Sequence, residues 1–202
     1  MTVMFFAFAQ PAFAQSQIVE LFVAAHCAPN EVAEDILQRV KAKENTSGVL
    51  ALTCDLAHPW CKKRRSLYTG KKILRRYSTP SSVVNGRYDV LAYDERIMRS
   101  ALAMVRSTMS LPRIFVQPAD RGVSFTLPVS GGERYYTPWV VVYHRDTTAV
   151  VSARALDVVY RDKGADVCRF ASADFDINHG VAVFLHKPDG EIAAVGNYAG
   201  DR

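Results

Sequence analysis

The sequence has no hydrophobic run long enough to cross a membrane. Its longest apolar stretch near the start, 3–9, is far shorter than the roughly 20 residues that a spanning helix needs. It also lacks an extreme composition, since 49% of its 202 residues are hydrophobic and 22% are charged. This balance is typical of a folded protein and excludes disorder, collagen and coiled coil. The net charge of +5 is too small by itself to indicate nucleic-acid binding.

Charged residues are absent from 1–17. That segment has a Phe-rich apolar core followed by Ala12-Phe13-Ala14, with small residues at the positions that signal peptidase recognises. We therefore expect a signal peptide over 1–14 and an exported, periplasmic chain that starts near Gln15. A buried first strand is the alternative, and the lack of a basic n-region leaves open a start upstream of Met1.

The first half of the chain alternates strand and helix patterns. An apolar run over 18–24 predicts a strand buried on both faces, and VLALT at 49–53 predicts a second one. Between them, 31–43 has apolar residues at helical spacing, with acids early and bases late, which predicts a helix. Strand, helix and strand then form a right-handed parallel unit. The other predicted elements of this half are a basic helix within 54–77, a hairpin of 81–84 with 88–91 around Asn85-Gly86, and a helix over 95–107.

The pattern changes after Pro112. Apolar residues alternate with small or polar ones from Val123 to Val129, which is typical of a half-buried strand. Further strands are predicted at 139–143, 153–160, 181–185 and 192–195. We therefore predict an α/β part up to about residue 110, followed by an antiparallel, β-sandwich-like domain at 112–202.

The β-rich part offers few candidates for chemistry. His144, His179 and His186 are scattered along it, and we expect them to be surface or hydrogen-bonded histidines. Cys168 lies close to Val167 and Phe170 in an apolar segment, so we expect a buried or unpaired thiol there.

Acidic residues are absent between Leu56 and Tyr88, whereas nine basic residues lie there. Several of the bases recur at helical spacing, which predicts one cationic helix face. Such a face attracts acidic peptides, anionic glycans or lipid head groups, and salt screens the attraction. We do not expect nucleic acid as a partner, because the chain is expected to be exported. A solvated face without function is the alternative. The candidate steering residues are Lys62, Lys63, Arg64, Arg65, Arg75 and Arg76.

Two motifs of the first half are similar to those of a known family. VELFVAAHCAPN at 19–30 places a cysteine turn directly after the first strand, and YSTPSSVVNGR at 77–87 contains Thr79-Pro80. Together they resemble a family of secreted bacterial thioredoxin-like proteins of unknown function. The resemblance implies a thioredoxin-like domain at 17–110, so the fold class expected is α/β plus β.

The resemblance also implies a reactive thiol. It places Cys27 at the first turn of a helix, where unpaired backbone N–H groups and the positive end of the helix dipole stabilise a thiolate. It places Pro80 opposite this thiol with a cis peptide bond, and Thr79 then offers its backbone to an extended substrate. Cys27, Thr79 and Pro80 become the catalytic candidates, with no cofactor and with a protein or peptide partner, acidic in the simplest case.

Asn30 departs from the family pattern. The relatives have the second cysteine of a C-x-x-C turn at this position, and an asparagine cannot resolve a mixed disulfide. Two-cysteine exchange by a local C-x-x-C is therefore excluded. Three interpretations stay open: Cys27 acts as a monothiol, it pairs with Cys54 or Cys61, or the site is inactive.

Cysteine is scarce, and the four residues present allow three pairings that the sequence cannot rank. Cys54 and Cys61 are spaced to close a small disulfide loop, and either is an alternative partner for Cys27. With His26 and His58 they also suggest a Cys/His metal cluster, but the spacing does not fit the usual zinc pairs, so no metal is expected. The candidate accessory residues of the site are His26, Asn30, Cys54, His58 and Cys61.

The function predicted from the sequence is a thiol- or disulfide-related activity of an exported thioredoxin-like protein, through Cys27 in an atypical C-x-x-N site. The alternative is a non-catalytic binding module that keeps the peptide groove and recruits an acidic or anionic partner. Fold alone is compatible with both functions.

Overall fold

The computed structural model describes residues 17–44, 48–74, 79–108, 111–119, 122–127, 137–156, 161–162, 165–171, 176–187 and 191–199. The expected signal peptide at 1–14 and two candidate steering residues, Arg75 and Arg76, lie outside these ranges. Among the helices described, none has the length and apolar character needed to span a membrane.

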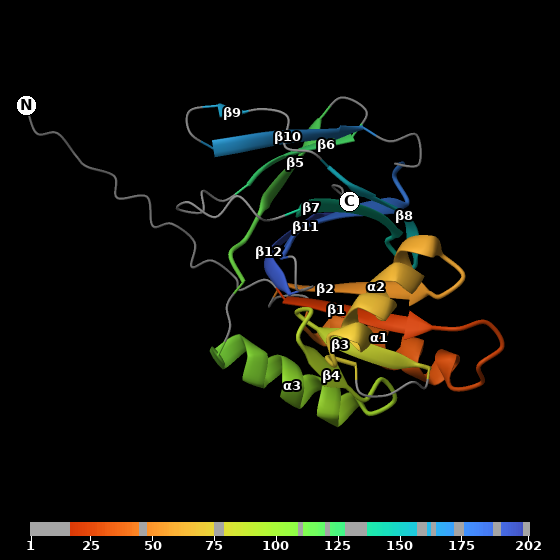
Figure 1. The fold of residues 1–202 in the computed structure, drawn as a ribbon. Helices are drawn as coiled ribbons and strands as arrows, with labels where there is room; N and C mark the ends of the chain where they lie inside the picture. Colours follow the sequence, from red (N-terminus) through yellow and green to blue (C-terminus); the bar gives the residue numbers. More distant parts are fainter. Residues whose placement is uncertain are drawn as a thin grey trace, which may run out of the picture.

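Four strands of the first half form one mixed sheet with the order β2-β1-β3-β4 (Figure 1). β1 (Gln17–Val23) runs parallel to β2 (Val49–Asp55) and antiparallel to β3 (Ser81–Val84), which pairs with β4 (Tyr88–Val90). The predicted hairpin is confirmed. Asn85 and Gly86 form its turn with φ of 50° and 69°, a left-handed conformation that asparagine and glycine tolerate.

Three helices cover the two faces of this sheet. α1 (Asn30–Lys43) and α3 (Glu95–Thr108) pack on the face that contains Val19, Leu21 and Val23. α2 (Pro59–Gly70) covers the face that contains Ile18 and Phe22. All seven residues of β1 are buried, as its continuous apolar run predicted. α2 spans only part of the predicted 54–77 segment, because β2 continues to Asp55 and the helix ends at Gly70.

The second half forms two antiparallel sheets, with the orders β12-β11-β7-β8 and β5-β6-β10-β9. The first contains β7 (Thr137–His144), β8 (Val150–Ala155), β11 (His179–His186) and β12 (Ile192–Tyr198). The second contains β5 (Phe115–Ala119), β6 (Gly122–Thr126), β9 (Arg161–Asp162) and β10 (Ala165–Ala171).

The strand predictions for this half are confirmed only in part. β8 begins and ends earlier than the predicted 153–160, of which 157–160 lie outside the described residues. β5 was missed because it is largely exposed and contains Pro118, so its sequence lacks an alternating pattern. β9 and β10 were also missed.

The sheet of β7, β8, β11 and β12 is covered on both faces. One face packs on the other β-sheet through a core that includes Val140, Val183 and Phe125. The opposite face shares a core with the first half, where Val141 and Phe184 join side chains of β1, β2 and α2. Figure 1 shows the resulting stack of layers, with the mixed sheet and its helices below the β-rich half.

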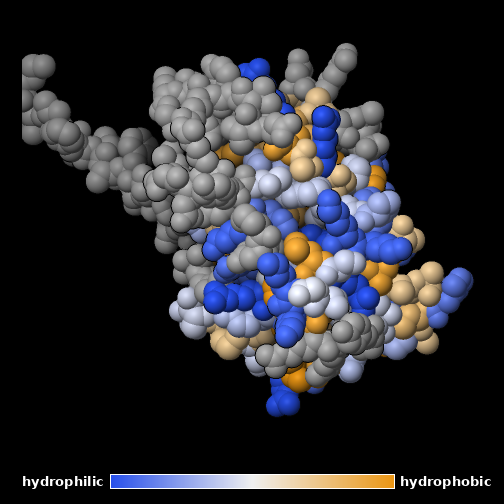
Figure 2. Space-filling model, viewed as in Figure 1, coloured by the Kyte–Doolittle hydropathy of each residue, from blue (hydrophilic) through white to orange (hydrophobic). Residues whose placement is uncertain are grey.

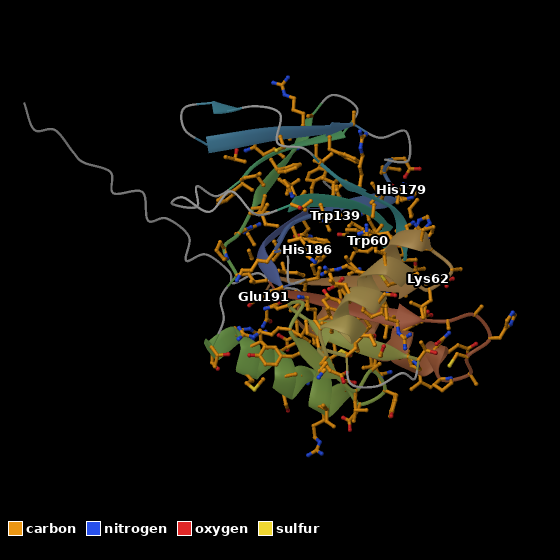
Figure 3. The ribbon with its side chains drawn as sticks, in the orientation of Figure 1. Trp60, Lys62, Trp139, His179, His186 and Glu191 are labelled. Carbon is orange, nitrogen blue, oxygen red and sulfur yellow. The ribbon has the colours of Figure 1, made fainter. Side chains whose placement is uncertain are left out.

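Two tryptophans mark this shared core. Trp60 of α2 and Trp139 of β7 lie next to each other in Figure 3, with ring centroids 6.0 Å apart. The backbone also bridges the two halves, since the Thr53 amide of β2 donates to the Thr148 carbonyl at 2.8 Å. The two halves are therefore joined by a continuous apolar core.

A buried ion cluster lies inside this shared core, formed by Glu20, Arg64, Tyr68 and His186. Arg64 donates from Nε to Glu20 Oε1 at 2.7 Å and from Nη2 to Glu20 Oε2 at 2.9 Å. The Tyr68 hydroxyl donates to Glu20, and Arg64 also donates to the Tyr68 hydroxyl and to His186 Nε2 of β11. Burial raises the pKa of Tyr68 well above its usual range, which keeps its proton available as a donor.

Arg64 corrects one prediction from the sequence. We expected it on the exposed cationic face of its helix, but its exposed fraction is 4% and its partner Glu20 is fully buried. The bidentate pairing explains this placement, because a buried carboxylate needs an opposite charge and several hydrogen bonds.

We predict that Arg64→Ala lowers the free energy of unfolding by about 3–5 kcal/mol, because it leaves the Glu20 carboxylate buried without its partner. Lys63→Ala, on the same helix but exposed, serves as the control and should change stability by no more than about 0.5 kcal/mol. Urea unfolding measures both values. Equal losses in the two variants would contradict a structural role for the cluster.

Candidate functional site

The predicted site cysteine lies in the turn between β1 and α1. The Cys27 amide donates to the Ala24 carbonyl at 3.3 Å, and the Asn30 amide donates to the Cys27 carbonyl at 2.9 Å. The helix begins at Asn30 with Pro29 as its N-cap residue. Cys27 therefore precedes the first helical turn, whereas the resemblance implied a place within it. Its side chain is half-buried, while His26 beside it is exposed with a φ of 60°.

Thr79 meets this cysteine although the two are 52 positions apart. The Cys27 thiol donates to the Thr79 carbonyl oxygen at 3.2 Å, and the Thr79 hydroxyl lies 3.8 Å from the sulfur as a donor. The Thr79–Pro80 peptide bond is cis, as the resemblance implied. β3 follows directly at Ser81, which pairs with Phe22. The fold thus brings the two motifs together at the carboxyl end of β1.

The contact between Cys27 and Thr79 has a chemical consequence. The thiol must hold its proton to donate to the carbonyl oxygen, whereas a thiolate would accept from the Thr79 hydroxyl instead. Thr79 therefore offers a partner to either protonation state of the sulfur. The Thr79 carbonyl oxygen has two lone pairs, so it can also accept a hydrogen bond from an extended substrate.

Asn30 supports the turn. Its side-chain amide donates at 2.6 Å to the carbonyl oxygen of Ala24, which is the last residue before the turn. Its carbonyl oxygen Oδ1 is buried and has no hydrogen-bond partner among the described residues. The asparagine thus closes the turn that presents Cys27, at the position where the family pattern has a second thiol.

The other cysteine candidates are placed differently from Cys27. Cys54 and Cys61 are both fully buried and contact each other in the core that includes Phe22 and Trp60. His58 is the N-cap residue of α2. Within the described ranges, no three or more histidine, cysteine or acidic side chains gather as metal ligands would.

The cationic surface is smaller than predicted. Lys62 and Lys63 are exposed on the first turns of α2, whereas Arg65 is half-buried and has its own partners. The Leu56 amide donates to the Val23 carbonyl at 2.9 Å, so the loop that leads into α2 adjoins the end of β1. Figure 2 shows hydrophilic side chains over much of the face that α2 presents, with hydrophobic patches between them.

The structure also contains a cleft that sequence reasoning missed. It has a volume of about 790 Å³ and lies between α1, the start of β2 and the ends of the β-rich strands. Its polar lining residues are Gln38, Lys41, Arg145, Asp146, Asn178 and Asn197. Cys27 and Thr79 are not among the lining residues. No motif could indicate this cleft, because its walls come from segments far apart in the chain.

The three histidines and the cysteine of the β-rich half pack against other side chains of the fold and lie outside the Cys27 site. The rings of His144 and His179 contact each other at a tilt of 35°, with centroids 4.7 Å apart, and His186 contacts Arg64 of the ion cluster. Cys168 is buried in the core between the two β-sheets, which confirms the expectation of a buried thiol.

Comparisons with known proteins support the fold and leave the family open. No protein-family model matches the chain, and no curated protein matches it significantly. Protein AGR_C_4864 from Agrobacterium tumefaciens, a structural-genomics target, has a similar structure with a TM-score of 0.69 at 20% identity, over 94% of this chain and 97% of that one. HBP35 of Porphyromonas gingivalis has a TM-score of 0.65 at 14% identity, over 94% of this chain and 76% of that one. At these identities the similarity establishes a shared fold: a mixed α/β sheet with three helices, followed by two antiparallel sheets.

Proposed function

We propose that residues 17–110 form a thioredoxin-like domain of an exported, periplasmic protein and that Cys27 acts as a monothiol in disulfide exchange. Three features support the domain: the strand order β2-β1-β3-β4, the helices on both faces, and Thr79-Pro80 beside the cysteine turn. The observation that carries the function is the 3.2 Å contact between the Cys27 sulfur and the Thr79 carbonyl oxygen. It links the nucleophile to the backbone that would hold an extended substrate.

The exchange begins when the Cys27 thiolate attacks one sulfur of a partner disulfide. A bond forms between Cys27 and that sulfur, and the partner's other sulfur leaves as a thiolate. Asn30 cannot complete the reaction, so an external thiol, either the partner's own or a small-molecule thiol, must attack the mixed disulfide to release Cys27. The chain would therefore hold its partner covalently for longer than a C-x-x-C protein does.

An extended peptide suits the surroundings of Cys27. A backbone N–H of the peptide would donate to the Thr79 carbonyl oxygen, beside the thiol or in its place, as a stronger donor than a thiol. β1 and β2 end together, with Val23 paired to Asp55, so the start of α2 shares this edge of the sheet. The exposed Lys62 and Lys63 favour a peptide with acidic residues, through an attraction that salt weakens.

We predict that one thiol reacts rapidly with a disulfide reagent such as Ellman's reagent and that Cys27→Ser removes this reaction. Cys27 is half-buried, whereas the other three cysteines are buried. The three buried thiols should therefore react with the reagent at least about tenfold more slowly than Cys27. Cys168→Ser is the matched control and should keep the fast phase. A fast phase that survives Cys27→Ser would contradict the assignment.

Thr79→Val tests the contact between the Thr79 hydroxyl and the Cys27 sulfur. The variant removes the donor that lies 3.8 Å from the sulfur while keeping the side-chain volume. We expect iodoacetamide to alkylate Cys27 at pH 7 at least about twofold more slowly in the variant, because the sulfur loses a group that stabilises its thiolate. An unchanged alkylation rate would contradict a role for this hydroxyl in the reaction.

We predict that Asn30→Cys converts the site into a two-cysteine exchanger. The second thiol would resolve the mixed disulfide within the molecule, which should raise the rate of catalysed insulin reduction by at least about tenfold. Asn30→Ser is the control, since it also removes the amide but supplies no thiol. Failure of Cys27 and the new cysteine to form a disulfide would count against a thioredoxin-like turn.

The non-catalytic binding module stays the second candidate, favoured by the loss of the resolving thiol at Asn30. Binding of a cysteine-free acidic peptide separates the two functions. If Cys27→Ser binds the peptide as tightly as the parent, and Lys62→Glu/Lys63→Glu weakens binding at low salt, the groove recruits partners without thiol chemistry.

A further inference from the structure

A second pair of thiols lies outside the Cys27 site. Cys54 belongs to the end of β2, and Cys61 belongs to the first turn of α2. Both side chains have an exposed fraction of 0%, and their thiols are in hydrogen-bonding contact with each other. They are surrounded by the core that α2 shares with β1 and the β-rich half, which includes Phe22 and Trp60.

The local fold brings the two sulfurs together. The loop between them is closed by three hydrogen bonds: the Leu56 amide to the Val23 carbonyl at 2.9 Å, the Ala57 amide to Asp55 Oδ1 at 2.8 Å, and the His58 amide to the Asp55 carbonyl at 3.0 Å. Pro59 then starts the helix, where its missing N–H costs nothing. The helix turns Cys61 back over the sheet and onto Cys54.

We propose that Cys54 and Cys61 form a structural disulfide that fastens the start of α2 to β2. An exported chain meets oxidants, and two contacting thiols in a compact loop are suited to oxidation. This inference rests on the export included in the proposed function, but it concerns different sulfurs from those of the proposed exchange and does not depend on Cys27 chemistry. It also selects one of the cysteine pairings that the sequence left open.

The oxidation proceeds by two exchange steps with a disulfide oxidant, either glutathione disulfide or an oxidising protein disulfide. The thiolate of one cysteine attacks the oxidant, forms a mixed disulfide and releases one oxidant thiolate. The second cysteine then attacks the mixed disulfide, closes the Cys54–Cys61 bond and releases the other oxidant thiolate. Two protein thiols are oxidised, and one oxidant disulfide is reduced to two thiols.

The burial of Cys54 and Cys61 indicates that their disulfide forms during folding, before the two thiols are enclosed. Burial raises the pKa of the Cys54 thiol, and the contact with Cys61 and the nearby Glu20 carboxylate raise it further. The folded, reduced Cys54 is therefore poor in thiolate, and burial closes both thiols to oxidants. Oxidation takes place before α2 packs on the sheet, and the bond then keeps in place the helix that supplies Arg64 and Tyr68 to Glu20.

Mass analysis of the chain exported to an oxidising compartment tests the bond directly. Lys43 and Lys62 enclose both cysteines with no basic residue between them, so tryptic digestion places them in one peptide, 44–62. After unfolding in an alkylating agent, we expect this peptide unalkylated and lighter than the dithiol by two hydrogen atoms. Full alkylation of both cysteines, or a link from either one to Cys27, would overturn the proposal.

Thermal unfolding tests its structural role. The oxidised chain should melt roughly 5–10 °C above the reduced chain, as a short disulfide loop implies for a protein of this size. Cys54→Ala/Cys61→Ala should remove the dependence of the melting temperature on reductant, whereas Cys27→Ser should keep it. Equal melting temperatures for the oxidised and reduced parent chain would reject a stabilising Cys54–Cys61 disulfide, and this comparison holds even if the double variant fails to fold.

The pH dependence of stability gives a third measurement. In the reduced chain the unfolded Cys54 loses its proton above about pH 8.5 while the folded one keeps it, so the free energy of unfolding falls as the pH rises beyond that value. The oxidised chain has no Cys54 proton to lose and should not show this decline. If the free energy of unfolding of the two forms showed the same pH dependence, the proposed loss of the Cys54 thiol in the oxidised chain would be contradicted.

Discussion

The buried carboxylate of Glu20 is the constraint on which the arrangement of the layers depends. It lies in the central strand of the mixed sheet, where a charge is stable only if it is paired and fully hydrogen-bonded. Arg64 and Tyr68 of α2 satisfy it on one side, and His186 of β11 contacts the same arginine. The Glu20 carboxylate thus requires α2 to pack on the mixed sheet, and the contact of Arg64 with His186 joins β11 to the same cluster.

This constraint explains why the two halves share a core. An ion cluster of this kind contributes less to stability than an apolar core of the same volume, but it tolerates few alternative packings. The apolar side chains around it, among them Phe22, Trp60 and Phe184, exclude water from the cluster and strengthen its electrostatic interactions. The Cys54–Cys61 pair lies in the same layer, so a covalent bond there would stabilise the helix that neutralises Glu20.

The cysteine chemistry divides between two places with opposite physical character. Cys27 is half-buried at the carboxyl end of β1, where Thr79 contacts its sulfur and a partner can approach. Cys54 and Cys61 are fully buried, and burial raises the pKa of the Cys54 thiol. We propose the first place for exchange with a partner and the second for a bond that forms once and persists. Asn30 limits the first place to a single thiol and uses its side-chain amide to hold the turn.

The sequence by itself determined the elements whose patterns are local. The continuous apolar run of β1, the charge order of α1 and the Asn85-Gly86 turn predicted their structures because backbone conformation and burial on both faces depend on neighbouring residues. The resemblance carried by two short motifs also indicated that Cys27 and Pro80 belong to one site. Only the tertiary structure decided that Arg64 points inward to Glu20, that Cys61 meets Cys54, and that the β-rich half closes over α2. These outcomes depend on pairings between distant segments, and a basic residue in a polar helix gives no local sign that a buried carboxylate opposes it.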